Sequence, residues 1–198
     1  MAMPFIKSDR KYTWEEYKTW PAGERWEIIE GAAYCMSPAP STTHQKIVLN
    51  IALKVGGFFE KHPCRLFIAP TDVAFDQYNV VQPDIFVVCD RGKIKERNVE
   101  GAPDMVIEVL SPATLLKDKR EKKLLYERFG VREYCLINPD EEIVERYHLA
   151  GNRYESADII NWDESLTFNI FPELTINLWE IFEKALPSPS PPPPDKDN

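Results

Sequence analysis

The 198-residue sequence contains neither a long apolar run nor a closely spaced cysteine pair. No apolar stretch approaches the ~20 residues that a membrane-spanning helix requires. The N-terminal segment MAMPFIKSDRKYTWEEY has no apolar core of the kind found in signal peptides. We therefore expect a cytoplasmic protein that does not associate with a membrane.

Cysteine is scarce, and the four residues are spread along the chain: Cys35, Cys64, Cys89 and Cys135. No two of them form the CxxC pair typical of zinc sites and redox centres. Three lie inside apolar, strand-like runs, where cysteine usually acts as a small hydrophobic side chain. The sequence thus predicts reduced cysteines and no zinc.

Positive charge is in deficit, because 24 Lys and Arg face 32 Asp and Glu for a net charge of −8. This balance argues weakly against a polyanionic partner. The deficit is uneven, since residues 91–132 contain 11 Lys and Arg against 7 Asp and Glu, a net charge of +4. That local excess suits a phosphate-bearing substrate around the site proposed below, although a solvated, lysine-rich helix face explains it equally well.

The composition that is present belongs to a globular protein, with 43% hydrophobic and 12% aromatic residues. The length favours one folded domain, which we place at residues 1–186. Residues 187–198 are rich in proline and are expected to form a disordered extension.

Hydrophobic periodicity and turn residues outline the secondary structure. Helices are expected to begin after the N-caps Thr13 and Ser41, the second reaching about Glu60. The remaining expectations are two strands within 25–36, strands at 66–69, 73–75 and 82–89, a surface loop at 90–100, a hairpin at 142–157 and a short closing helix from 171 to 182.

The most informative stretch is 101–139, whose pattern predicts a strand, a helix and a second strand. Asp104 to Leu110 is apolar on both faces except for Glu108, as expected of a strand covered on both sides. A buried carboxylate needs a cation, a base or several hydrogen bonds, because its burial alone is costly. The helix should end at Gly130, and Glu133 to Ile137 should form the returning strand.

One sector of that helix mixes apolar and charged residues. At about 100° per residue, the sector contains Leu115, Asp118, Lys122, Leu125, Tyr126 and Phe129. Four charged residues fall outside it and are expected to be solvated: Lys119, Arg120, Lys123 and Glu127. Lys122 could simply extend its ammonium to solvent from the edge of the stripe. The nearby Glu108 and Asp118 favour a polar site instead.

Asp84 stands directly before an apolar run and Glu108 within another, so the two carboxylates meet if these strands pair. Two carboxylates with water molecules form an ordinary magnesium site, because this ion prefers oxygen ligands. A lysine beside them can hold or deprotonate the attacking water. Asp84 could alternatively cap a strand or a turn, and Tyr126 could belong to the core with its hydroxyl satisfied.

Several motifs resemble the Uma-type family of putative restriction endonucleases, within the P-D…(D/E)-x-K nuclease superfamily. They are Pro83-Asp84, Gly101-Ala102-Pro103-Asp104 with Glu108, Leu110-Ser111-Pro112 with Asp118, Lys122 and Tyr126, and Gly130-Val131-Arg132-Glu133-Tyr134. Upstream, Glu27 with Gly31, Ser37-Pro38 and His44 also fit. The resemblance spans roughly residues 13–178.

This resemblance implies an α/β (α+β) fold with a restriction-endonuclease-like core, in which helices flank a mixed, mostly antiparallel sheet. It also implies hydrolysis of phosphodiester bonds in DNA with Mg²⁺ or Mn²⁺ as cofactor. Asp84 and Glu108 would bind the metal and Lys122 would complete the catalytic set, with Glu27, His44, Asp118 and Tyr126 in support. The superfamily lysine two residues after the acid is replaced by Leu110, and Lys122 matches the family's relocated lysine.

A second hypothesis is a catalytically inactive nuclease fold that serves as a nucleic-acid-binding or protein-interaction module. The acidic net charge and the relocated lysine favour it, whereas the retained Asp84, Glu108 and Lys122 favour the enzyme. The sequence leaves open the choice between DNA and RNA and the oligomeric state, for which a homodimer is one option.

Overall fold

The computed structural model describes residues 6–7, 9–21, 23–36 and 39–186. The expected proline-rich extension and the Ser37-Pro38 motif lie outside the described residues. The helical elements are α1 (Trp14–Tyr17), α2 (Thr42–Glu60), the 3-10 turn η1 (Arg91–Lys93), α3 (Leu115–Lys117), the π-helical segment η2 (Asp118–Lys122), α4 (Lys123–Phe129) and α5 (Leu178–Ile181). The strands are β1 (Ile6–Lys7), β2 (Trp26–Ile29), β3 (Ala32–Cys35), β4 (Arg65–Ile68), β5 (Asp72–Asp76), β6 (Asn79–Val81), β7 (Ile85–Val88), β8 (Asn98–Glu100), β9 (Met105–Val109), β10 (Glu133–Asn138), β11 (Ile143–Ala150), β12 (Arg153–Tyr154), β13 (Asp158–Asn161), β14 (Ser165–Phe168) and β15 (Phe171–Asn177).

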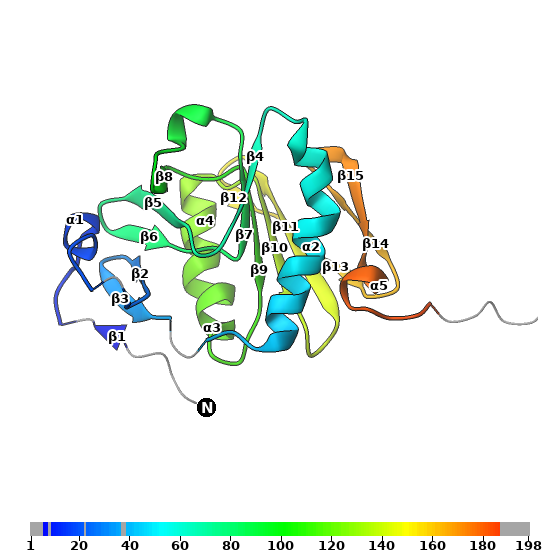
Figure 1. Cartoon of the computed structure of the whole chain (residues 1–198), viewed down its shortest axis with the longest axis horizontal. Coiled ribbons are helices and arrows are strands. Elements are labelled where there is room, and N and C mark those ends of the chain that lie inside the picture. Colours follow the sequence, from blue (N-terminus) through cyan, green and yellow to red (C-terminus); the bar gives the residue numbers. More distant parts are fainter. Residues whose placement is uncertain (1–5, 8, 22, 37–38, 187–198) are drawn as a thin grey trace, which may run out of the picture.

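A seven-stranded sheet forms the centre of the molecule, in the order β12-β11-β10-β9-β7-β4, with β13 beside β11. Strand β9 is parallel to β10 and antiparallel to β7. Figure 1 shows α2 on one side of these strands and the α3–α4 run on the other. Both faces are therefore covered, which explains why β7, β9 and β10 are buried at every position.

Alternate residues of β7 and β9 enter two different apolar cores. Ile85 and Ile107 pack with the inner face of α2, which presents Ile47, Ile51 and Val55. Phe86 and Val106 face the other way and pack with Leu125 and Tyr126 of α4. This alternation is the two-residue period of a strand, and it places Glu108 on the α4 side of the sheet.

A second, six-stranded sheet has the order β1-β3-β2-β6-β5-β8. It contributes Ile29, Val73 and Val81 to the core that also contains α4. Among its described strands only β5 and β8 pair in parallel, so both sheets are mixed and mostly antiparallel, as the family resemblance implied. The expected α+β fold class is confirmed.

Most of the expected elements are found. Thr13 and Glu16 form a reciprocal capping box at the start of α1, and Ser41 caps α2. The strand at 104–110 is β9, the helix ends at Gly130, and β11 and β12 form the expected hairpin. Asp104, just before β9, accepts a hydrogen bond from the Cys89 N–H.

Two expectations for secondary structure are wrong. Within 171–182, Phe171 to Asn177 forms β15 paired with β14, and only Leu178–Ile181 is helical. Leu174, Ile176 and Leu178 are buried at every second position, a strand period that short apolar runs do not separate clearly from a helical one. Within the expected surface loop at 90–100, Asn98–Glu100 forms β8 beside β5.

The expectation of reduced cysteines is also wrong, because Cys64 and Cys89 form a disulfide. They flank the antiparallel pair β4–β7, in which Arg65 lies opposite Val88, so the next pair outward is Cys64 and Cys89. Cys35 and Cys135 are free. Of the helices described, none has the length and apolar character needed to cross a bilayer.

The helical run between β9 and β10 contains a widened turn. It begins as α3, continues as the π-helical η2 and ends as α4. Because a π-helix bonds residue i to i+5, residues five apart come to lie on nearly the same side. The run therefore buries Lys117 as well as Asp118 and Lys122.

Gly130 ends α4 with a left-handed backbone at φ 81°. We predict that Gly130→Ala lowers the free energy of unfolding by about 1 kcal/mol, because an L-residue is strained there. Gly57→Ala is the matched control, since Gly57 lies inside α2 with no heavy atom within 4 Å of an added Cβ. The control should gain about 0.5–1 kcal/mol in urea unfolding. Equal effects from both would contradict this role of Gly130.

Candidate active site

The two carboxylates Asp84 and Glu108 meet at one end of the central sheet. Ile85 pairs with Ile107 across the antiparallel strands β7 and β9. The next pair of positions toward that end of the sheet is Asp84 and Glu108. The Glu108 Oε2 atom accepts a bond from the Asp84 N–H at 3.3 Å. In turn, Asp84 Oδ2 accepts one from the Val109 N–H at 2.8 Å. Each carboxylate thus binds the backbone beside the other.

Lys122 places its ammonium in the middle of the site. The Nζ atom lies 2.8 Å from Glu108 Oε1, 2.8 Å from Glu27 Oε1 and 3.5 Å from Asp118 Oδ1. Its side chain is only 3% exposed, so the ammonium does not extend to solvent. The surrounding carboxylates raise the pKa of Lys122 well above its ordinary value, although burial alone would lower it.

Tyr126 and His44 hold the two carboxylates from opposite sides of the sheet. Tyr126, on α4, donates its hydroxyl hydrogen to Glu108 Oε1 at 2.7 Å. His44, in the first turn of α2, places Nε2 3.1 Å from Asp84 Oδ2. Burial lowers the pKa of His44, but the Asp84 carboxylate outweighs it and the net shift is upward. All seven residues predicted for the site therefore lie in one connected cluster.

Glu27 joins this cluster from the second sheet. Its Oε1 atom forms an ion pair with the Lys122 ammonium and accepts a hydrogen bond from the Gln82 N–H at 3.1 Å. Its Oε2 atom pairs with the Lys117 ammonium. Burial would raise the pKa of Glu27, but the two lysines lower it to about 2. Glu27 is therefore ionised at neutral pH although its side chain is fully buried.

Sequence reasoning missed Lys117 and Gln82. At 100° per residue, Lys117 lies outside the sector of Lys122, and only the π-helical turn brings both to one side. Gln82 acts through its backbone, while its side chain accepts two bonds from Arg25 and donates to Asp72 at 2.9 Å. The only sequence signal for Gln82 was its position directly before Pro83-Asp84.

Acidic groups outnumber the buried lysines. Glu27, Glu108 and Asp118 share Lys117 and Lys122, and Asp84 lies at the edge. Burial, together with Asp118, Asp84 and Glu27, raises the pKa of Glu108 to about 8 despite the ammonium of Lys122. Burial also raises the pKa of Asp118, so without a further cation this group of acids favours a bound proton, with Glu108 among its carriers.

A hard divalent cation suits this set of oxygen atoms. None of the described residues donates a hydrogen bond to Asp84 Oδ1, and Glu108 Oε2 accepts only the 3.3 Å bond from Asp84. Magnesium often binds one or two carboxylates and keeps several waters. Within the described ranges, no group of three or more His, Cys, Asp and Glu side chains has the spacing of a metal site.

The outer charges on the helical run are paired as well. Lys119 pairs with Glu145 at 2.5 Å, and the Lys123 ammonium lies 3.9 Å from the centre of the Tyr147 ring. The expectation that both are merely solvated is thus wrong. The basic segment 91–97 follows β7, whereas Asp84 precedes it, so this part of the positive charge lies at the opposite end of the sheet.

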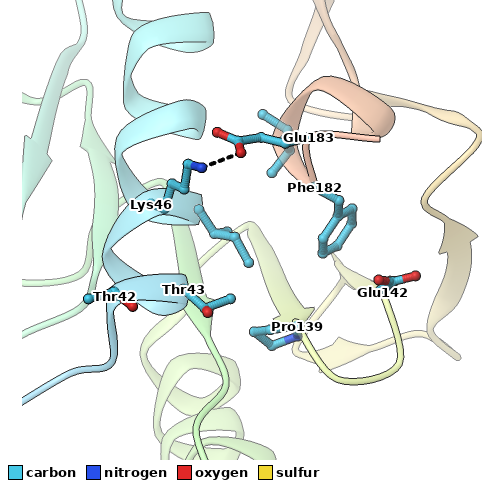
Figure 2. A pocket seen from close by; sticks show the side chains of 9 residues that line it. Thr42, Thr43, Lys46, Pro139, Glu142, Phe182 and Glu183 are labelled. Carbon is cyan, nitrogen blue, oxygen red and sulfur yellow. Dashed lines mark ion pairs between the residues drawn. The ribbon is translucent and has the colours of Figure 1, made fainter. Parts of the chain in front are cut away.

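A pocket of about 480 Å³ lies beside the first turn of α2. Figure 2 shows Lys46 and Glu183 paired at its rim, with Phe182 and Glu142 facing it from the other wall. Two glutamates and one lysine are the charged residues in its lining. This balance disfavours a phosphate, and none of the seven site residues contributes to the pocket.

Comparison with known proteins identifies the family. The model of the Uma2 family, described as "Putative restriction endonuclease", matches residues 14–178. The chain belongs to the Uma2 family. The match spans the strand-helix-strand stretch and every residue of the candidate site, which agrees with the resemblance seen in the sequence.

Two individual proteins are similar to this chain. The uncharacterized protein slr1290 of Synechocystis sp. is 26% identical over 138 residues, which cover 68% of this chain and 72% of that protein. A crystal structure from Anabaena variabilis, described as "a putative nuclease belonging to DUF820", superposes with a TM-score of 0.72 at 23% identity. The superposition covers 86% of this chain and 97% of that one, and it shows a shared fold.

The raised pKa of Glu108 predicts a specific pH dependence. Between its ordinary value of 4.5 and about 8, the folded protein holds a proton that the unfolded chain releases. The free energy of unfolding should therefore fall as pH rises, by up to ~1.4 kcal/mol per pH unit. Urea unfolding in EDTA across this range should show the slope for wild type and a flatter curve for Glu108→Gln. Parallel curves would contradict the assignment.

Glu27 and Glu108 should differ sharply in their effect on stability. Glu27→Gln removes the only carboxylate paired with Lys117 in the described structure, which should cost about 3–5 kcal/mol. Glu108→Gln leaves Lys122 paired with Glu27, so its cost should stay below about 2 kcal/mol. Unfolding at pH ~6 in EDTA measures both. An equal loss from the two variants would show that Lys122 depends on both acids alike.

Proposed function

We propose that this protein is a metal-dependent endonuclease that hydrolyses phosphodiester bonds in DNA. The observation that carries the proposal is the Lys122 ammonium, buried 2.8 Å from Glu108, with Asp84 directly beside that carboxylate. Two acids and a lysine held on strands and a helix are the groups that this hydrolysis requires. Membership of the Uma2 family supports the same reaction class.

Asp84 and Glu108 would bind Mg²⁺ or Mn²⁺. The bound ion would neutralise charge that develops on the phosphate oxygens and favour ionisation of a water molecule. Lys122 orients Glu108 and is the candidate to hold the attacking water, while the Tyr126 hydroxyl is the second donor to Glu108 Oε1. His44 holds Asp84 from the α2 side.

Substrate access is expected at the Asp84 side of the cluster. The Asp84 side chain is 18% exposed, whereas His44 is 8% exposed and Lys122 and Glu108 are 3% exposed. A phosphate would therefore meet Asp84 first and reach Lys122 only behind it. This order agrees with a metal bound at Asp84, near the entrance, and with Lys122 holding the attacking water deeper in the site.

One observation favours the alternative of an inactive nuclease fold that binds nucleic acid or protein. Both oxygens of Glu108 already accept hydrogen bonds from the protein, so the protonated group has hydrogen-bond partners without a metal. In an enzyme, the cation would replace the proton on Glu108 and the long 3.3 Å bond from Asp84. The two functions therefore differ in their response to metal.

Lys122→Met should lower the rate of Mn²⁺-dependent cleavage of plasmid or oligonucleotide DNA by about 10³-fold or more. Lys123→Met is the matched control, because the neighbouring Lys123 lies over Tyr147 on the outer face. It should retain activity within about threefold, since it contributes at most a phosphate contact. Mn²⁺ should also raise the melting temperature of wild type.

Two results would overturn the enzyme assignment. One is a wild-type protein whose melting temperature does not rise with Mn²⁺ and that does not cleave DNA. The other is an equal loss of cleavage in both lysine variants, which would reduce the lysines to a charge patch. RNA offered in parallel with DNA determines which nucleic acid is the substrate.

A further inference from the structure

One buried lysine has no part in the chemistry proposed above. Lys117 is 6% exposed, and its ammonium pairs with a Glu27 carboxylate that is itself fully buried. Lysines are almost never buried unless they are paired. Because Lys117 is enclosed, it cannot act as a surface contact for DNA. Its ion pair with Glu27 is the contact that links it to Lys122.

The π-helical segment determines which residues Glu27 meets. A regular α-helix would place Lys117 and Lys122 about 140° apart. The i to i+5 bonding of η2 turns both toward the second sheet. As a result, Lys117 occupies Glu27 Oε2 while Lys122 occupies Glu27 Oε1. Each oxygen of this carboxylate therefore pairs with a different lysine of the same helical run.

This arrangement bears on Lys122, which is shared equally between two acids. Its Nζ atom lies 2.8 Å from Glu27 and 2.8 Å from Glu108. The charge of Lys117 offsets part of the attraction that Glu27 exerts on Lys122. Without Lys117, Glu27 would keep its full charge opposite a single cation and would draw Lys122 away from Glu108.

We propose that Lys117 is a positioning residue that, by holding Glu27, keeps the Lys122 ammonium between Glu27 and Glu108. The kinetic consequence rests on the proposed nuclease function, because it follows from the place of Lys122 at the reaction centre. The geometric consequence does not, because it concerns only the contacts of buried side chains. The two are therefore tested separately.

The geometric test is a crystal structure of Lys117→Met, which keeps the unbranched stem and removes the charge. Lys122 Nζ should move beyond 3.5 Å from Glu108 Oε1 while staying with Glu27. The matched control is Lys119→Met, since Lys119 also pairs with a glutamate on the same helical run but outside the cluster. There the distance of 2.8 Å should remain.

A second variant guards against failure to fold. Lys117→Gln keeps a hydrogen-bond donor near Glu27 without the positive charge, so it should fold and show the same displacement of Lys122. If Lys122 stays at 2.8 Å from Glu108 in either variant, the proposal is overturned whether or not the protein is an enzyme.

The kinetic test measures kcat and KM for Mn²⁺-dependent DNA cleavage. Lys117→Met should lower kcat by about 10- to 100-fold, as expected when a catalytic group is displaced by an ångström or so. KM should stay within about twofold, because a buried lysine does not touch the substrate. Lys117→Arg, which keeps the charge, should recover kcat to within about threefold of wild type.

Lys119→Met supplies the kinetic control and should leave kcat within about twofold. An equal loss of kcat in the Lys117 and Lys119 variants would overturn the proposal. Wild-type protein that cleaves no nucleic acid would overturn the nuclease function instead. In that case the displacement of Lys122 alone still decides the role of Lys117.

Discussion

The pairing of the Glu27 carboxylate with two lysines is the interaction on which the centre of this protein depends. Glu27 comes from β2 in the second sheet, and both lysines come from the helical run that covers the central sheet. An ionised carboxylate without water is tolerated only where cations and hydrogen bonds surround it. The contact therefore fixes the second sheet, the helical run and, through the Gln82 N–H, the turn before Asp84 relative to one another.

The same contact explains how the candidate site can be both rigid and charged. The two lysines lower the pKa of Glu27. The pKa of Glu108 stays raised, because burial and the neighbouring carboxylates outweigh the ammonium of Lys122. One acid serves the structure and the neighbouring acid stays available for another cation. Nearby carboxylates whose environments push their pKa values apart are typical of sites in which the two groups have different roles.

Features that depend on sequence patterns over a few residues could be predicted, whereas features that depend on contacts between distant residues could not. Glu108 and Lys122 were found together because strand and helix periods act over a few residues, and both lie within one strand-helix-strand stretch. Lys117 was missed because one π-helical turn changes the angular rule that placed Lys122. The Cys64–Cys89 disulfide and the pairing of β8 with β5 depend on contacts across 25 or more residues, which local patterns do not encode. Phe171–Asn177 was assigned wrongly because a short apolar run fits two periods.

The origin of Glu27 and its partners in distant parts of the chain also determines the order in which the protein can be completed during synthesis. On the ribosome, β2 and β3 emerge long before the segment with Lys117 and Lys122. Until that segment appears, the nascent protein contains an acid with no cation to neutralise it in the interior. The second sheet cannot complete its packing over an ionised Glu27 at this stage, so its final packing has to wait for the helical run. The N-terminal third of the chain is thus translated first but packed late.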